Sequence, residues 1–247
     1  MTPLLGIVAL GAVMGGFVQG LSGFAFGLVA MSLWAWTMEP ALAGPLVVFG
    51  SLVGQLLSIG TVRRGFDRRR IMPFILGGVV GVPLGVALLA HVDPLGFRLA
   101  VGILLVLWCP AMLLARDLPR IDHGGRLADS AVGLIGGVMG GLGGLTGPAP
   151  TLWATLRGWD RDAQRAVFQA FNLSMQCLTM AAYLATGTIS PQVWPLFLAL
   201  VPAMLLPTLL GARLYRRFDD ASFRKVVLGL LTLSGVVLVA TALPKFL

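Results

Sequence analysis

Long apolar runs separated by short clusters of charged residues extend from one end of the chain to the other. Cutting the sequence at the charge clusters leaves eight runs, at residues 4–36, 41–62, 71–90, 99–115, 127–156, 166–186, 193–212 and 226–243. A helix of about 20 residues crosses a hydrocarbon core about 30 Å thick, and only backbone that satisfies its own hydrogen bonds is stable in lipid. The pattern therefore predicts an all-α polytopic membrane protein with a single membrane domain.

The first and fifth runs, 4–36 and 127–156, are about 30 residues long and glycine-rich at their centres, which read GGFVQGLSG and GGVMGGLGGLTG. Glycine weakens a helix interior and permits a sharp change of direction, as in the interrupted helices of membrane transporters. We expect each of these two runs to be a re-entrant helical hairpin. The other six runs are predicted to be transmembrane helices.

The two glycine-rich runs also resemble each other, and the similarity continues to the end of each half. The matching segments are 13–16 and 138–141 (both VMGG), 20–23 and 144–147 (GLSG and GLTG), and 85–98 and 211–224 (GVALLAHVDPLGFR and GARLYRRFDDASFR). Such internal similarity is typical of a duplicated unit. The chain is therefore predicted to consist of two homologous halves, residues 1–118 and 119–247, each a hairpin followed by three helices.

The distribution of positive charge indicates how the two hairpin runs enter the membrane. If each run crosses once, sixteen Arg and Lys residues divide eight against eight between the two faces. If each run returns to the face that it entered from, all sixteen share one face, opposed only by Arg98 and Lys245. The positive-inside rule favours the second arrangement, with eight plain spans as the alternative. It places the basic loops in the cytoplasm and both termini outside, and an odd number of crossings per half makes the halves an inverted repeat.

Composition supports the bilayer as the solvent of this chain. It is 57% hydrophobic and 11% charged, against roughly 25% charged residues in soluble domains. The net charge of +8 is explained by cytoplasmic loops, so we expect no nucleic-acid partner. Cys109 and Cys177 lie in apolar runs without a C-x-x-C motif, which predicts neither a disulfide nor a metal site and leaves a thiol role for Cys177 open.

The GLSG segment spells the motif of a nucleophilic serine in rhomboid-type intramembrane proteases, with Ser22 as the nucleophile. Such a serine needs a base, normally a histidine at similar depth in another span. The only histidines, His91 and His123, lie in polar breaks, and the second copy of the motif carries Thr146 in place of the serine. We therefore expect a protein that is not an enzyme and has no cofactor, with an intramembrane enzyme as a remote alternative.

The interior of the runs holds neutral polar residues: Gln19, Ser22, Ser51, Gln55, Ser58, Thr146, Gln169, Asn172, Ser174, Gln176 and Thr179. Gln169, Asn172 and Gln176 follow the spacing i, i+3, i+7 and so share one helical face. Hydrogen bonding between helices is one explanation for these residues. Their position after the second glycine-rich turn favours a polar pathway.

The two glycine-rich turns are candidates for an anion site near the membrane midplane. Free N–H groups and the dipole at a helix end attract anions, and glycine allows an anion to approach the backbone. The predicted substrate-binding residues are Gln19, Gly20, Ser22, Gly23, Gly144, Thr146, Gly147, Asn172 and Gln176. The alternative for these glycines is close helix packing, which we expect for Gly77, Gly81 and Gly85.

The segments GGFVQGLSGFAFGLV and GGVMGGLGGLTGPAPTLW, each followed by three spans, resemble the sulfite exporter TauE/SafE family, also called the toluenesulfonate uptake permease family. The resemblance covers nearly the whole chain. Pro148 and Pro150 depart from the family pattern, in which many members place glycine or a single later proline, and they leave the geometry of the second turn open. The resemblance implies a transporter of sulfite, sulfoacetate or another organosulfonate in the bacterial inner membrane.

Together these features predict a secondary transporter of a small sulfur-containing oxyanion, with a passive anion channel of the same architecture as the alternative. The sequence leaves open which anion is carried, whether it is exported or taken up, and whether an ion is coupled to it. It also leaves the oligomeric state open, with a homodimer as one alternative.

Overall fold

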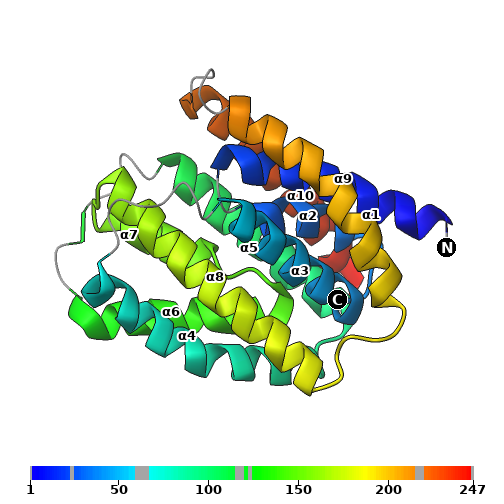
Figure 1. The fold of residues 1–247 in the computed structure, drawn as a ribbon, viewed down its shortest axis with the longest axis horizontal. Coiled ribbons are helices and arrows are strands. Elements are labelled where there is room, and N and C mark those ends of the chain that lie inside the picture. The colour runs from blue at the N-terminus through cyan, green and yellow to red at the C-terminus, as the bar shows by residue number, and fades with distance from the viewer. Residues whose placement is uncertain are drawn as a thin grey trace.

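The computed structural model describes residues 2–22, 25–58, 67–114, 120–121, 124–214 and 220–245. These residues form ten α-helices and one short 3-10 helix, and no β-strand occurs among them. Figure 1 shows the helices, which are α1 (Thr2–Ser22), α2 (Phe26–Trp34), α3 (Pro40–Ser58), α4 (Arg68–Leu89), α5 (Pro94–Leu114), α6 (Gly125–Gly143), α7 (Pro148–Leu156), α8 (Arg161–Ala185), α9 (Val193–Leu214), α10 (Asp220–Ala242) and the 3-10 helix η2 (Leu243–Lys245). The all-α prediction is confirmed for the described part of the chain, and each glycine-rich run is broken into a long and a short helix.

Each short helix folds back along the long helix that precedes it. In the first half, the indole Nε1 of Trp34 at the end of α2 donates a 3.0 Å hydrogen bond to the carbonyl of Ile7 in α1. In the second half, the N–H of Ile121, before α6, donates a 2.9 Å hydrogen bond to the carbonyl of Leu156 at the end of α7. Both glycine-rich runs are therefore helical hairpins whose two ends lie close together.

The two arms of each hairpin differ in length. At 1.5 Å per residue, the 21 residues of α1 and the 19 residues of α6 extend about 31 and 28 Å, close to the thickness of a hydrocarbon core. The nine residues of α2 and of α7 extend only about 13 Å each. The long arm of each hairpin is therefore long enough to reach most of the way across such a core, whereas the helix of the short arm is not.

The long hairpin arm of each half packs against a helix of the other half. Figure 1 shows α6 of the second half beside α4 of the first, and α1 of the first half beside α9 of the second. Glycines allow these approaches, since a Cβ on Gly81 would meet the carbonyl of Leu134 and a Cβ on Gly20 would meet the carbonyl of Thr208. The last helices of the halves, α5 and α10, pack against each other. The close packing expected of three glycines in α4 is confirmed for Gly77, Gly81 and Gly85.

Large apolar side chains cover the outside of the bundle, whereas amide side chains lie inside it. Leu198, Leu206 and Leu107 expose 77%, 68% and 67% of their surface, whereas Gln19 and Gln176 are buried. Soluble proteins have the opposite arrangement, so this surface is suited to lipid. Within the described part of the chain, the helices long and apolar enough to cross a membrane are α1, α3, α4, α5, α9 and α10. The chain is a multi-pass membrane protein.

Helix α8 is long enough to cross a membrane, because its 25 residues extend about 37 Å. It is not one of the six apolar helices because it carries several polar residues. Three of these, Gln169, Asn172 and Gln176, are only 6%, 3% and 2% exposed. The helix predicted at 166–186 is therefore present, with its polar residues turned toward the protein, and its crossing of the membrane stays a prediction.

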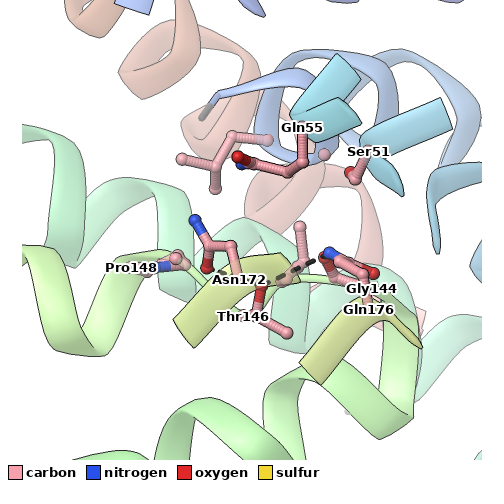
Figure 2. A pocket seen from close by; sticks show the side chains of 11 residues that line it. Ser51, Gln55, Gly144, Thr146, Pro148, Asn172 and Gln176 are labelled. Carbon is pink, nitrogen blue, oxygen red and sulfur yellow. Dashed lines mark hydrogen bonds between the residues drawn. The ribbon is translucent and has the colours of Figure 1, made fainter. Parts of the chain in front are cut away.

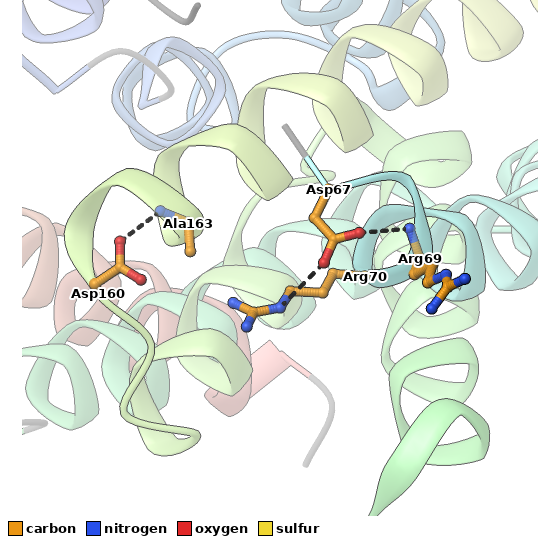
Figure 3. A network of polar contacts seen from close by, with 5 residues as sticks. All are labelled: Asp67, Arg69, Arg70, Asp160 and Ala163. Carbon is orange, nitrogen blue, oxygen red and sulfur yellow. Dashed lines mark hydrogen bonds and ion pairs between the residues drawn. The ribbon is translucent and has the colours of Figure 1, made fainter. Parts of the chain in front are cut away.

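Helices α4 and α8 begin on one arginine-rich face, where an aspartate caps each of them (Figure 3). Asp67 accepts a 2.8 Å hydrogen bond from the N–H of Arg69, and Asp160 accepts one of 2.9 Å from the N–H of Ala163. The guanidinium of Arg70 lies 5.6 Å from the centre of the Trp159 ring, which connects the two helix starts. The N-terminal end of α8 therefore lies at a charged surface of the protein.

Candidate functional site

A small polar cavity lies between α2, α3, α8 and the turn that joins α6 to α7. Its walls are Gly27, Leu28, Ser51, Gln55, Gly144, Leu145, Thr146, Gly147, Pro148, Asn172 and Gln176. Figure 2 shows Ser51 and Gln55 on one side and Thr146, Asn172 and Gln176 on the other. The cavity volume of about 10 Å³ holds about one water molecule. In this conformation the space at the site is therefore smaller than an oxyanion.

A hydrogen-bond network joins the α6–α7 turn to α8. The hydroxyl of Thr146 donates to Oδ1 of Asn172 at 2.8 Å. The Nε2 of Gln176 donates to the carbonyl of Gly144 at 2.8 Å and to Oγ1 of Thr146 at 3.3 Å. Because Oδ1 of Asn172 accepts from Thr146, its amide nitrogen points away from the turn, toward the side of the cavity where Gln55 lies (Figure 2). An N–H donor is thus directed into the cavity.

The opposite wall comes from α3. Ser51 and Gln55 are four residues apart, so they lie one above the other on one helical face, and they are 5% and 3% exposed. Asn172 and Gln176 on α8 have the same spacing. Both α3 residues were recognised in the sequence as interior polar residues but were not predicted to bind substrate. Their four-residue spacing is the signal that matches the pair on α8.

The second turn is built by a glycine that no other residue could replace without strain. Gly144 ends α6 with φ 73°, in the left-handed region that favours glycine. A Cβ on Gly144 would also lie 2.7 Å from Cγ1 of Val47. On the far side of the turn, the indole of Trp108 donates a 2.8 Å hydrogen bond to the carbonyl of Pro148. The turn is therefore fixed from both sides.

The prolines reduce the number of backbone N–H donors that this turn presents to an anion. Pro148 is the first residue of α7 and Pro150 is the third, and proline has no backbone N–H. The start of α7 therefore lacks two of the amide donors that a helix end normally presents. Side-chain donors from α3 and α8 take a larger share of the polar lining than the sequence suggested.

The first turn has a different geometry from the second. Oε1 of Gln19 accepts a 3.0 Å hydrogen bond from the N–H of Phe26, the first residue of α2. Oγ of Ser22 accepts from the N–H of Ala25 at 3.2 Å and donates to the carbonyl of Val18 at 2.8 Å. These two side chains satisfy backbone groups at the break between α1 and α2.

The structure accordingly divides the predicted site residues into two groups. The cavity brings together Gly144, Thr146, Gly147, Asn172 and Gln176. Gln19, Gly20 and Ser22 do not line it, and a Cβ on Gly20 would lie 2.8 Å from the backbone nitrogen of Ala212 in α9. Gly23 lies outside the described residues.

No ionisable side chain lines the described cavity, and its donors are amides and hydroxyls. Neutral donors can hydrogen-bond an oxyanion without the strong attraction of a buried cation. The histidine that a serine nucleophile requires is absent from the lining. His91 lies exposed in the turn after α4, where Nδ1 donates to the carbonyl of Ala87 at 3.0 Å, and His123 lies outside the described residues. The arrangement is suited to holding a small anion and releasing it.

Comparison with known proteins agrees with this geometry. A curated relative from Cupriavidus necator, named "Probable sulfite/organosulfonate exporter TauE", is 24% identical over 250 residues, which cover 98% of this chain and 96% of the relative. No solved structure matches the chain. The family described as "Sulfite exporter TauE/SafE" matches residues 7–238. Because this match covers most of the chain, the protein belongs to the sulfite exporter TauE/SafE family, which consists of membrane transporters rather than enzymes.

Proposed function

We propose that the protein is a secondary transporter of a small sulfur-containing oxyanion, such as sulfite, sulfoacetate or another organosulfonate. The observation that carries this proposal is the buried cavity whose polar walls are all neutral and come from both halves of the chain. Ser51 and Gln55 come from the first half, and Thr146, Asn172 and Gln176 from the second. The family and the name of the C. necator relative supply the sulfur chemistry.

Neutral donors fit a substrate that must be released as well as bound. The amide nitrogen of Asn172 is available because Thr146 occupies Oδ1 of the same side chain. Ser51 and Gln55 add hydroxyl and amide groups from the facing helix. A fixed positive charge at this depth would bind an oxyanion tightly and slow its departure. The cavity is therefore suited to rapid exchange.

The size of the cavity fits a transporter whose binding site opens to one side of the membrane at a time. A volume of about 10 Å³ admits about one water molecule, so an anion enters only when the walls move apart. Movement of the two halves relative to each other would expose the site alternately to each side, as in other transporters built from repeats. A passive channel would instead need a continuous pore.

The membrane arrangement that we propose is an inverted repeat with two re-entrant hairpins, in the bacterial inner membrane. The fold-back of α2 on α1 and of α7 on α6 supports re-entry. The equivalent packing of α1 against α9 and of α6 against α4 supports the repeat. The arginine-rich face at the start of α4 and α8 would be cytoplasmic, with both termini outside.

Binding to the purified protein tests the site. At a concentration 100-fold above its Kd, an anion that binds only the folded state stabilises it by about 2.7 kcal/mol. We expect sulfite, sulfoacetate or an aryl sulfonate to raise the unfolding temperature in detergent, in contrast to chloride. The variant Asn172→Leu should lose this response. The control Ser174→Ala should keep it, because the Ser174 hydroxyl donates to the carbonyl of Ala170 in its own helix. An equal response of Asn172→Leu and the wild type would contradict the site.

A further inference from the structure

The central cavity accounts for only part of the polar surface of α8. Gln169, Asn172, Gln176, Thr179 and Tyr183 are spaced by three, four, three and four residues, and this spacing keeps them on one helical face. All five are buried, with exposed fractions of 6%, 3%, 2%, 0% and 0%. Only Asn172 and Gln176 line the cavity. The same polar stripe therefore continues beyond the cavity in both directions.

The flanking residues of this stripe have buried polar atoms without hydrogen-bond partners in the described part of the chain. These atoms are Nε2 and Oε1 of Gln169 and Oγ1 of Thr179. Oε1 of Gln176 is also buried without a hydrogen-bond partner. A buried polar group that makes no hydrogen bond destabilises the folded state, so native proteins rarely retain one without a reason. Water or a polar ligand that contacts these atoms would provide that reason.

Thr179 differs from the other threonines in the interior of the described helices. Threonines that bond to the carbonyl four residues earlier in their own helix are Thr151, Thr155, Thr186, Thr208, Thr232 and Thr241. Ser174 on α8 does the same. This bond is the usual way to satisfy a hydroxyl in a helix. The Thr179 hydroxyl, fully buried on the polar stripe, does not use it.

The neighbours of this stripe on α6 and α3 are glycines. Oγ1 of Thr179 lies 3.7 Å from the place where a Cβ on Gly140 of α6 would stand. Further along, the hydroxyl of Tyr183 donates a 2.7 Å hydrogen bond to the carbonyl of Gly141 and lies 3.0 Å from the Cβ position of Gly44 in α3. On this side of the cavity α8 therefore faces glycine backbone on two helices.

We propose that this stripe forms the transport pathway, with Gln169 and Thr179 as contact positions for anion and water on either side of the central cavity. The proposal rests on the transporter function proposed above. Gln169 lies toward the arginine-rich face, because it follows the Asp160 cap of α8. Thr179 lies toward the opposite face, where the Tyr183 hydrogen bond to α6 closes the path in this conformation. From Gln169 to Tyr183 the stripe extends about 21 Å, most of the thickness of a hydrocarbon core.

Two conservative variants separate a pathway from ordinary packing. Gln169→Leu and Thr179→Val remove the unpartnered atoms while keeping similar volumes. We expect each to lower the transport rate about tenfold, which corresponds to a barrier higher by about 1.4 kcal/mol. The unfolding temperature should stay the same or rise, because a buried group without a partner is lost. Ser174→Ala, on another face of α8, should leave transport unchanged. A lower unfolding temperature with normal transport would overturn the proposal.

Cysteine accessibility provides a readout that does not depend on transport. In a background in which Cys109→Ala and Cys177→Ala remove the native thiols, Gln169→Cys and Thr179→Cys are each treated with the impermeant reagent sulfonatoethyl methanethiosulfonate in membranes. We expect both to react about tenfold faster than the control position Ala181→Cys, whose exposed side chain would face lipid in the proposed arrangement and so be kept from water and reagent. Sulfoacetate should slow the reaction, and it is preferred to sulfite, which cleaves the mixed disulfide.

The two hypotheses fail in different ways. If the wild type transports sulfur anions but both cysteines remain unreactive, the pathway is wrong and the transporter function stands. If both cysteines react and no sulfur anion is transported, a polar path along α8 is supported and the proposed substrate is wrong.

Discussion

The hydroxyl of Thr146 is the single atom that joins the α6–α7 turn to both amides of α8. It donates to Oδ1 of Asn172 at 2.8 Å and accepts from Nε2 of Gln176 at 3.3 Å. The side chain is 1% exposed, and a Cβ on Gly140 would lie 2.5 Å from its methyl group. The substitution Thr146→Val keeps the shape and this methyl contact while removing the hydroxyl. Its effect therefore reports the hydrogen bonds.

The expected loss of stability follows from the groups left behind. Oδ1 of Asn172 loses the donor shown in Figure 2, whereas Nε2 of Gln176 keeps its bond to the carbonyl of Gly144. A buried acceptor left without a donor lowers the free energy of unfolding by about 1–3 kcal/mol, and a single hydrogen bond between membrane helices contributes up to about 1.7 kcal/mol. We expect Thr146→Val to lose about 1–2 kcal/mol. For a chain of this length the unfolding temperature should fall by about 2–8 °C.

Thermal unfolding in detergent measures this loss, and Thr146→Ser is the matched control because it keeps the hydroxyl. The serine variant should unfold closer to the wild type than the valine variant does. In the valine variant the Asn172 amide is no longer held by the turn, so the stabilisation by sulfur oxyanions should also weaken. An unfolding temperature of Thr146→Val equal to that of the wild type, with unchanged anion stabilisation, would refute the network as the organiser of the site.

Three further predictions concern packing, thiols and topology. Gly81→Ala forces α4 away from α6 and should lower the free energy of unfolding by about 1–3 kcal/mol, measured by thermal unfolding. The control is Gly229→Ala, because a Cβ on Gly229 meets nothing within 4 Å. Equal losses in the two variants would contradict the packing. In folded, detergent-solubilised protein, a maleimide should label the exposed Cys177 and should label the buried Cys109 only after denaturant is added. Rapid labelling of both cysteines without denaturant would show that α5 is not packed as described. A reporter fused after Trp36 should lie on the same side of the membrane as the N-terminus, and the opposite side would exclude a re-entrant first hairpin.

The sequence predicted the number and approximate bounds of the long helices, and three of its errors at helix starts share one cause. The spans at 71–90, 99–115 and 166–186 begin three to five residues earlier in the structure, at Arg68, Pro94 and Arg161. In each case an aspartate just before the helix accepts hydrogen bonds from its first N–H groups. Cutting the sequence at charged residues assigns such capped turns to loops, although helices extend beyond the apolar segment when their ends are capped.

The candidate site was only partly predictable. The spacing of Asn172 and Gln176 after a glycine-rich turn was enough to bring these residues together with Thr146, because one helical face and one turn determine the contact. Ser51 and Gln55 have an equally clear spacing, but which helix they face depends on how α3 packs against α8. That packing is set by long-range contacts that a local pattern does not encode.

The two copies of the turn show a second limit. GLSG and GLTG have similar sequences, yet Ser22 accepts a hydrogen bond from the backbone of its own break and Thr146 bonds to a different helix. The difference arises because Gln19 caps α2, while the matching position in the second half is Gly143, which has no side chain. Equivalent positions in a repeat therefore need not have equivalent roles.

Counterflow in proteoliposomes tests the central claim most directly. Vesicles containing the purified protein are loaded with unlabelled sulfite or sulfoacetate and diluted into a trace of the same anion carrying a radioactive label. A secondary transporter that binds its substrate in the Asn172 cavity should take up the labelled anion transiently above its equilibrium level, and Asn172→Leu should abolish this uptake. Uptake that shows no stimulation by the internal anion, or no uptake of any sulfur anion above protein-free vesicles, would contradict it.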